Sequence, residues 1–297
     1  MDGSPLDARA DWTAARQTRR ALLATVALLA APRGHTAAAP IAQPTVETLL
    51  VLPVTPPDPP YPWFSIRLMT LEPGSVESFG RTEFHGTGDI GFVVNQGEIS
   101  FETDGPALVA RKGGNVIANG IPVAAGSATR LLPGDQAVTA AGVVSRRRNT
   151  GSAQAATYEL SATDNGQIVA DHDGIRFWDA APECFPRLFA DGSPATHAIA
   201  TLLRVALPPD EQLRLRDVPH AEILVVENGM VDLYTGGNPL VTSGLDSAPK
   251  RLLRMMPLTG QSALGAMFNP ETIFRRGSAE PATMLVATLA PGTSPAT

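Results

Sequence analysis

The chain has 297 residues, of which 43% are hydrophobic and 18% are charged, and its formal net charge is −6. This composition is typical of a globular protein and excludes an intrinsically disordered chain. The acidic balance gives no electrostatic reason to expect a nucleic-acid partner, so we interpret the Arg-Arg-Arg run at 146–148 as a solvated strand edge. The single cysteine, Cys184, excludes an internal disulfide and a zinc site built from several cysteines.

The first 39 residues have the features of an export signal. A twin arginine, Arg19 and Arg20, precedes an apolar run from Ala21 to Ala31, and small residues follow it. The apolar run is too short to span a bilayer as a helix, and no lipid-accepting cysteine follows, so no stable membrane anchor is expected. The arginine pair favours the twin-arginine type of signal, and the alternatives are a Sec-type signal with incidental arginines or a buried core helix. We therefore predict export to the bacterial periplasm or the extracellular space.

The rest of the chain divides into a lead-in, two similar units, a connector between them and a short tail. Residues 40–62 are proline-rich and are expected to run extended along the edge of the first unit. The units, 63–163 and 196–291, consist of short apolar and β-branched runs, each closed by Gly, Pro, Asn or Asp. Turn signals recur without a long helical period, which predicts an all-β sandwich or barrel for each unit. The connector, 164–195, is expected to hold a short helix, and 292–297 form the tail.

Two internal matches indicate that the second unit is a copy of the first. GSAQAAT at 151–157 matches GSAEPAT at 277–283, an offset of 126 residues. VVNQGEISFETDG at 93–105 matches VVENGMVDLYTGG at 225–237, an offset of 132 residues. A period of this length is far beyond that of solenoid repeats, so the repeated unit is a domain of its own.

These repeated stretches resemble the cupins, and specifically the two-domain bicupins. GDQAVTAAGVVSRRRN fits the skeleton of the second cupin motif through Gly134, Gly142 and Asn149. AEILVVENG fits the end of the first motif, with Glu222 as its acidic residue and Gly229 as its glycine. The resemblance implies two tandem cupin-type jelly-roll β-barrels after the N-terminal signal segment.

In the first unit, the family's metal-ligand positions carry mostly other residue types. Cupins usually hold a metal with two histidines and a glutamate of the first motif and one histidine of the second, a set that leaves a position open for substrate. The resemblance places Glu83 and His85 in the first two histidine positions, Ile90 in the glutamate position and Ser145 in the last. We therefore expect no metal here and take Glu83, His85 and Ser145 as substrate-binding candidates. The alternative is that Glu83 and His85 are only a surface or structural pair.

The second unit keeps more acidic residues. Glu222 occupies the glutamate position, Asp217 lies near a histidine position, and the 126-residue offset places Glu271 where Ser145 lies. His220 precedes Glu222 by two residues, so on a strand their side chains would share a face. If Asp217, His220, Glu222 and Glu271 converge, this oxygen-rich set would suit a divalent cation such as Mg²⁺, Ca²⁺ or Mn²⁺. The alternative is that they lie on exposed loops and do not converge.

The sequence thus predicts an exported bicupin-like protein with degenerate metal sites and a non-catalytic role, either binding a small molecule or acting as a structural barrel. No cofactor is expected beyond the divalent metal considered for the second barrel. The rival hypothesis is a metal-dependent oxygenase, isomerase or decarboxylase that acts in the second barrel through Glu222 and His220. A third hypothesis is an assembly module, a homo-oligomer that forms by pairing of barrel edges.

Overall fold

The computed structural model describes the chain in separate ranges. These are residues 44–54, 63–79, 89–140, 142–163, 175–179, 198–208, 211–234, 240–243, 250–251, 255–259, 262–265, 273–276 and 281–292. Nearly all regular structure within them is β-strand, which confirms the predicted all-β class. The proposed signal segment, 1–39, lies outside the described residues. No helix in the described ranges is long and apolar enough to cross a membrane.

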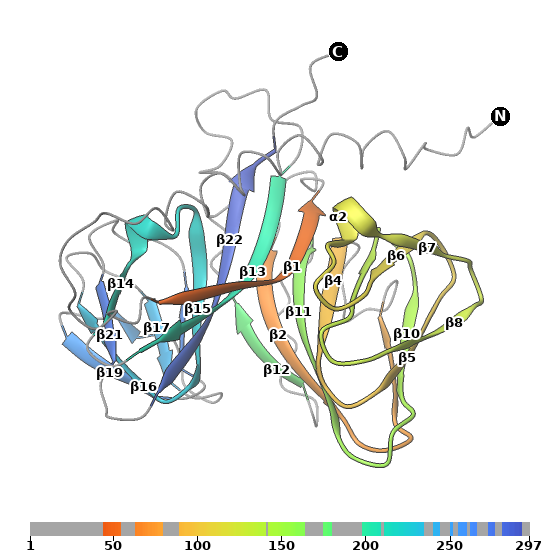
Figure 1. Cartoon of the computed structure of the whole chain (residues 1–297), viewed down its shortest axis with the longest axis horizontal. Coiled ribbons are helices and arrows are strands. Elements are labelled where there is room, and N and C mark those ends of the chain that lie inside the picture. The colour runs from red at the N-terminus through yellow and green to blue at the C-terminus, as the bar shows by residue number, and fades with distance from the viewer. Residues whose placement is uncertain are drawn as a thin grey trace, which may run out of the picture.

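The first barrel consists of two antiparallel sheets that enclose an interior (Figure 1). The larger sheet has the strand order β12-β2-β11-β4-β9-β6-β7, and the smaller has the order β3-β10-β5-β8. The strands are β2 (Trp63–Leu71), β3 (Val76–Phe79), β4 (Asp89–Gln96), β5 (Ile99–Thr103), β6 (Ala107–Ala110), β7 (Ile121–Val123), β8 (Ala128–Leu131), β9 (Gln136–Thr139), β10 (Ser145–Asn149), β11 (Ala155–Thr163) and β12 (Ile175–Asp179). A short helix, α2 (Val116–Asn119), precedes β7, and the side chain of Asn115 caps it by accepting a hydrogen bond from Ile117 N.

The second barrel repeats this plan. Its larger sheet has the strand order β1-β13-β22-β15-β20-β17-β18, and its smaller sheet has the order β14-β21-β16-β19. The strands are β1 (Thr45–Val54), β13 (Ala198–Leu207), β14 (Gln212–Arg214), β15 (Ala221–Asn228), β16 (Met230–Tyr234), β17 (Leu240–Ser243), β18 (Lys250–Arg251), β19 (Met255–Thr259), β20 (Ser262–Gly265), β21 (Ile273–Arg276) and β22 (Ala282–Pro291). A 3₁₀ turn, η1 (Leu215–Asp217), follows β14. The predicted pair of tandem jelly-roll barrels is therefore confirmed.

Strand β1 precedes the first barrel in the chain but belongs to a sheet of the second. It pairs with β13 in an antiparallel register from Thr45, opposite Ala206, to Val54, opposite Ala198. The expectation that the proline-rich lead-in runs along the first barrel's edge is therefore wrong for these residues. Proline is tolerated in β1 at Pro53 because β1 is the edge strand of its sheet. The described part of the connector is the strand β12, which pairs with β2, and the rest of it, where a short helix is expected, lies outside the described residues.

The two larger sheets face each other between the barrels (Figure 1), and they pack across one layer of apolar side chains. Leu50 and Leu52 of β1 lie against the first barrel's sheet over Gly91. A Cβ atom added at Gly91 would lie 3.2 Å from the side chain of Leu50 and 3.3 Å from that of Leu52. The absence of a side chain at Gly91 thus lets β1 approach β4 closely.

A polar contact joins the barrels at one edge of this layer. Arg204 of β13 donates two hydrogen bonds to Glu227 of β15, at 2.6 and 2.8 Å, and a third to Asn95 Oδ1 of β4 at 2.9 Å. The hydroxyl of Tyr158, on β11, donates to Glu227 Oε1 at 2.6 Å. Burial and this hydrogen bond raise the pKa of Tyr158, so the phenol stays protonated and continues to donate.

Equivalent hairpins confirm that the second unit is a structural copy of the first. Gly97 joins β4 to β5 and Gly229 joins β15 to β16, with φ angles of +78° and +79°. Both glycines lie against the first residue of an equivalent strand, Ala155 of β11 and Ala282 of β22. The two strands are thus related by 127 residues, since 282 − 155 = 127, one more than the offset of the matching sequence phrases. The alignment that set Glu271 opposite Ser145 is therefore one residue out.

The close approach at Gly97 generates a prediction. A Cβ atom at Gly97 would lie 2.7 Å from Ala155 Cα, whereas Gly126, with a φ of +74°, has no atom within 4 Å of such a Cβ. Gly126→Ala should lower the free energy of unfolding by about 1–2 kcal/mol, the cost of the left-handed backbone alone. Gly97→Ala should cost clearly more, because the hairpin must also move away from β11. Thermal unfolding of the two variants checks this, and equal losses would contradict it.

Candidate functional site

The three arginines at 146–148 do not share one environment. They form the middle of β10, where alternate side chains point to opposite faces of the sheet. Arg146 and Arg148 are exposed, whereas Arg147 has no exposed surface. The interpretation of the whole run as a solvated strand edge is therefore wrong for Arg147, whose side chain lies inside the first barrel.

Arg147 belongs to a cluster of charged side chains inside the first barrel. Arg147 Nη2 lies 2.6 Å from Glu159 Oε2, and Arg67 Nη1 donates to Glu159 Oε1 at 3.1 Å. Glu159 thus joins two guanidinium groups, one at each carboxylate oxygen. Glu77 lies directly opposite Arg147 in the pairing of β3 with β10 and is half-buried. We call Arg67, Glu77, Arg147 and Glu159 the charged cluster.

Aromatic contacts fix the position of Arg147. Its guanidinium carbon lies 3.9 Å from the centroid of the Phe92 ring, and Phe92 packs edge-on against Phe101 with centroids 5.4 Å apart. A guanidinium over an aromatic face gains electrostatic attraction. Burial lowers the pKa of Arg147, while the negative charges of Glu159 and Glu77 oppose this shift because they favour the cation.

The interior of the first barrel changes in polarity from one end to the other. On one side of the charged cluster the inward side chains are mostly apolar, including Met69, Val94, Ile99 and Leu131, with the buried Thr157 opposite Met69 and Val94 as a polar exception. On the other side, toward the ends of five strands, five of them carry hydroxyl groups and lie beside the apolar Ile90 and Ala107. These side chains, which we call the hydroxyl collar, are Ser65, Thr103, Thr139, Ser145 and Ser161, each at most 4% exposed. Within the collar, the hydroxyls of Ser65 and Ser161 are hydrogen-bonded at 2.7 Å.

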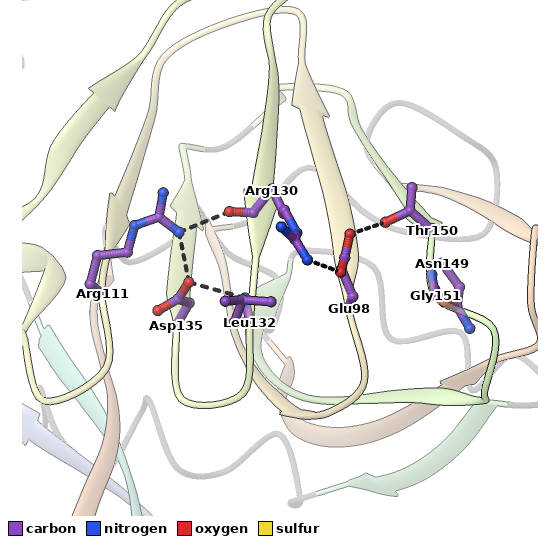
Figure 2. Close-up of polar contacts among 8 residues, drawn as sticks. All are labelled: Glu98, Arg111, Arg130, Leu132, Asp135, Asn149, Thr150 and Gly151. Atoms are coloured by element: carbon purple, nitrogen blue, oxygen red, sulfur yellow. Dashed lines mark hydrogen bonds and ion pairs between the residues drawn. The ribbon is translucent and has the colours of Figure 1, made fainter.

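The turns at the apolar end are tied together by polar contacts, shown in Figure 2. Asp135 accepts hydrogen bonds from Arg111 Nη1 at 2.7 Å and from the backbone amide of Leu132 at 3.0 Å. Glu98 forms an ion pair with Arg130 and accepts a hydrogen bond from the hydroxyl of Thr150.

Asn149 closes the same end from within. Its amide group donates to the carbonyls of Leu71 and Ala153, each at 2.8 Å, and its Oδ1 accepts from Gly151 N. Asn149 and Gly134, whose φ is +90°, are two residues that carry the family resemblance. Both residues stabilise turns, so these positions of the motif indicate the barrel fold and do not indicate a binding or catalytic site.

The second barrel has apolar residues at every position of the charged cluster. Strand pairing relates Arg67, opposite Glu159, to Leu203, opposite Val286. It likewise relates Arg147, opposite Glu77 and Phe101, to Phe274, opposite Leu213 and Leu233. Leu213, Phe274 and Val286 are buried in the apolar core of the second barrel, and Leu203 packs against it. The same fold is therefore built once around charges and once around hydrocarbon.

The candidate residues of the first unit are only partly described. Ser145 is 2% exposed and belongs to the hydroxyl collar, two residues before Arg147 on the same face of β10. Ile90, in the glutamate position of the resemblance, is also buried. Glu83 and His85 lie outside the described residues, in the segment that joins β3 to β4.

The candidate metal ligands of the second unit are not brought together where the structure describes them. Asp217 and His220 are exposed, and Glu222 is half-buried. His220 precedes β15 and has a left-handed φ of 61°, so the expectation that it shares a strand face with Glu222 is wrong. No group of three His, Cys, Asp or Glu side chains that could hold a metal occurs among the described residues. Glu271 lies outside them, so the four-residue metal site stays a prediction.

Sequence reasoning missed the charged cluster because its residues come from four strands. The alternation in SRRRN, with Ser145, Arg147 and Asn149 on one face, is the one local signal that could have placed an arginine inside the barrel. No such signal connects Arg67 with Glu159, which are neighbours only through the pairing of β2 with β11.

The strand order and register of the two barrels can be compared with known proteins. No family model and no curated protein sequence matches the chain. Among solved structures, the chain is similar to a cupin 2 conserved barrel domain protein from Leptotrichia buccalis, with 11% identity, a TM-score of 0.35, and 85% of this chain and 91% of that one covered. It is also similar to oxalate decarboxylase from Lactobacillus farciminis, with 8% identity, a TM-score of 0.42, and coverages of 87% and 88%. A third similar structure is pumpkin seed globulin, with 12% identity, a TM-score of 0.38, and coverages of 77% and 78%.

The chain folds as two tandem antiparallel β-barrels. Its own topology establishes this, since each half pairs a seven-stranded with a four-stranded antiparallel sheet in equivalent order. A fold of this kind does not by itself select a function. Function must be argued from the interiors of the two barrels, which differ.

The apolar counterparts in the second barrel provide a direct test of what the charged cluster does for stability. We expect a variant that carries Arg67→Leu, Glu77→Leu, Arg147→Phe and Glu159→Val, which we call the apolar-cluster variant, to fold with unchanged stability or a gain of about 1–4 kcal/mol, because it removes the desolvation cost of buried ions. Glu159→Val alone should cost about 3–5 kcal/mol, because it leaves two buried guanidinium groups without their shared carboxylate. Thermal unfolding measures both. A larger loss in the apolar-cluster variant than in Glu159→Val would show that the cluster is structural.

Proposed function

We propose that this protein is an exported, non-catalytic bicupin-like protein that binds a small polar molecule inside its first barrel. The observation that carries the proposal is the difference between the two interiors. The first holds Arg67, Arg147 and Glu159 with almost no exposed surface, and the second holds hydrocarbon at the equivalent positions. The sequence placed its substrate-binding candidates, Glu83, His85 and Ser145, in this first unit and its candidate metal ligands in the second.

The free-energy cost of burying charged side chains supports a binding role for the first barrel. Buried ion pairs seldom stabilise a protein more than well-packed apolar residues of similar size, and the second barrel demonstrates that this fold accepts such residues. Ligand sites are lined mainly by apolar side chains, with a few convergent polar groups that fix the orientation of the ligand. We therefore assign binding to the first barrel and a supporting role to the second.

The rival hypothesis, a metal-dependent enzyme acting in the second barrel, is separated from this proposal by metal content. We expect protein purified under native conditions to contain Fe, Mn, Ni and Zn well below one equivalent per chain. Under the rival hypothesis a stoichiometric metal is present and is lost in Glu222→Ala, whereas the control Glu102→Ala, on the outer face of β5, retains it. Elemental analysis of the three proteins measures this, and a stoichiometric metal that depends on Glu222 would overturn the proposal.

Export has its own test. In a bacterial host with both export pathways, the protein should be recovered from the periplasm with its N-terminus near Ala39, and the double variant Arg19→Lys/Arg20→Lys should remain inside as precursor. Cell fractionation and mass analysis of the mature chain check both points. Export of the double variant would favour a Sec-type signal, and uncleaved cytoplasmic protein in the wild type would refute export altogether.

A further inference from the structure

The turn between β15 and β16 brings together two groups that can react with each other. Asn228 is the last residue of β15 and is exposed, and Gly229 follows it. The backbone N–H of Gly229 donates a hydrogen bond to Asn228 Oδ1 at 2.8 Å. Glycine has no Cβ atom, so no side chain of its own shields this nitrogen. The side-chain carbonyl of Asn228 is thus held against the backbone nitrogen of the next residue, where water can reach both.

We propose that Asn228 is a modification site, at which asparagine converts spontaneously to aspartate and isoaspartate through a cyclic imide. In the first step the nitrogen of Gly229 loses its proton and attacks Asn228 Cγ. A new C–N bond forms, the bond from Cγ to the side-chain nitrogen breaks, and that nitrogen leaves as ammonia with the proton. Water from the solvent then adds to one of the two imide carbonyls and breaks its bond to the Gly229 nitrogen. Opening at Cγ gives aspartate, and opening at the main-chain carbonyl gives isoaspartate.

The first barrel contains the same turn with a different side chain before the glycine. Gln96 is exposed at the end of β4, and Gly97 has a φ of +78°, against +79° at Gly229. The glutamine side chain is one methylene longer, so attack by the Gly97 nitrogen would have to close a six-membered ring instead of a five-membered one, and such closure is slower. The two copies therefore share the turn and differ in the group that reacts.

A second Asn–Gly pair has the same residues in a different geometry. Asn119 is the exposed last residue of α2, and Gly120 follows it. The backbone of Asn119 is still helical, since its N–H donates to the carbonyl of Asn115 at 2.7 Å. Helical side chains point back toward the start of the helix, which directs the Asn119 amide away from the nitrogen of Gly120. Exposure and residue type are matched at the two sites, and the approach of the reacting groups is not.

Conversion at Asn228 would alter a turn that has little room. A Cβ atom added at Gly229 would lie 2.5 Å from the carbonyl oxygen of Pro281, so this part of the chain lies directly against the start of β22. Isoaspartate adds one atom to the main chain here, and either product adds a negative charge. Glu227, one residue earlier, accepts the hydrogen bonds of Arg204 and Tyr158 that join the barrels. We therefore expect conversion to lower the melting temperature.

The test incubates the folded, full-length protein at mildly alkaline pH and follows each site by peptide mapping and isoaspartate labelling. Asn228 should convert at least about tenfold faster than Asn119, because holding reacting groups together can contribute far more than this to a rate. The rate should rise with pH, since the attacking nitrogen must lose a proton. Mapping resolves each peptide, so the Asn–Gly pair at 165–166, which lies outside the described residues, does not enter the comparison.

Two variants exchange the reacting side chains of the matched turns. Asn228→Gln introduces the residue that the first barrel already carries there, so it should fold normally and show no conversion at this position. Gln96→Asn should create a second site in the first barrel. Before incubation the wild type and Asn228→Gln should melt at the same temperature, and after incubation the wild type should melt lower.

Three results would overturn the proposal: conversion of Asn119 as fast as that of Asn228, formation of aspartate without isoaspartate, or a Gln96→Asn variant that stays unmodified. None of these results bears on ligand binding in the first barrel, because the inference rests on a turn of the second barrel alone.

Discussion

The alternation of side chains along the strands of the two larger sheets governs this structure. In each of these sheets one face lines a barrel and the other packs against the opposite barrel, so both faces are buried. Along β11, for example, Tyr158 and Leu160 lie in the layer between the barrels, while Thr157 and Glu159 belong to the barrel interior. Shifting such a strand by one residue would put charges into the layer between the barrels and hydrocarbon into the interior of the first barrel. Packing, register and the candidate site therefore depend on the same period of two.

Much of the fold could be predicted from short-range patterns. Apolar runs closed by turn residues marked the strands, and Gly97 and Gly229 marked equivalent hairpins in both halves. The pairing of β1 could not be predicted, because its partner β13 is distant in the sequence and no feature of Thr45–Val54 indicates which strand it pairs with. The offset between the two units, obtained by matching identical residues, was one residue out. Such matching takes no account of which face of a strand each side chain occupies.

The candidate site was harder to predict from the sequence than the fold, because pairing of distant strands brings its residues together. Family resemblance pointed to Ser145 correctly as an inward residue, yet Arg147 beside it was interpreted as solvated. An arginine inside a barrel is stable only with partners, and those partners, Glu159, Glu77 and the Phe92 ring, come from other strands. Long-range pairing therefore decides the chemistry of the interior, whereas the motif residues Gly134 and Asn149 report local turns.

The exchange of β1 makes the two halves unequal as independent units. The strand leaves the ribosome before any of the first barrel, yet the edge it completes arrives only with β13. Until then Leu50 and Leu52 have only half of their apolar layer, and the second half of the chain, on its own, would expose the edge of β13 and the layer around it. The apolar surface that joins the halves thus becomes fully covered only when the whole chain is present, which makes this a single cooperative assembly rather than two barrels on a string.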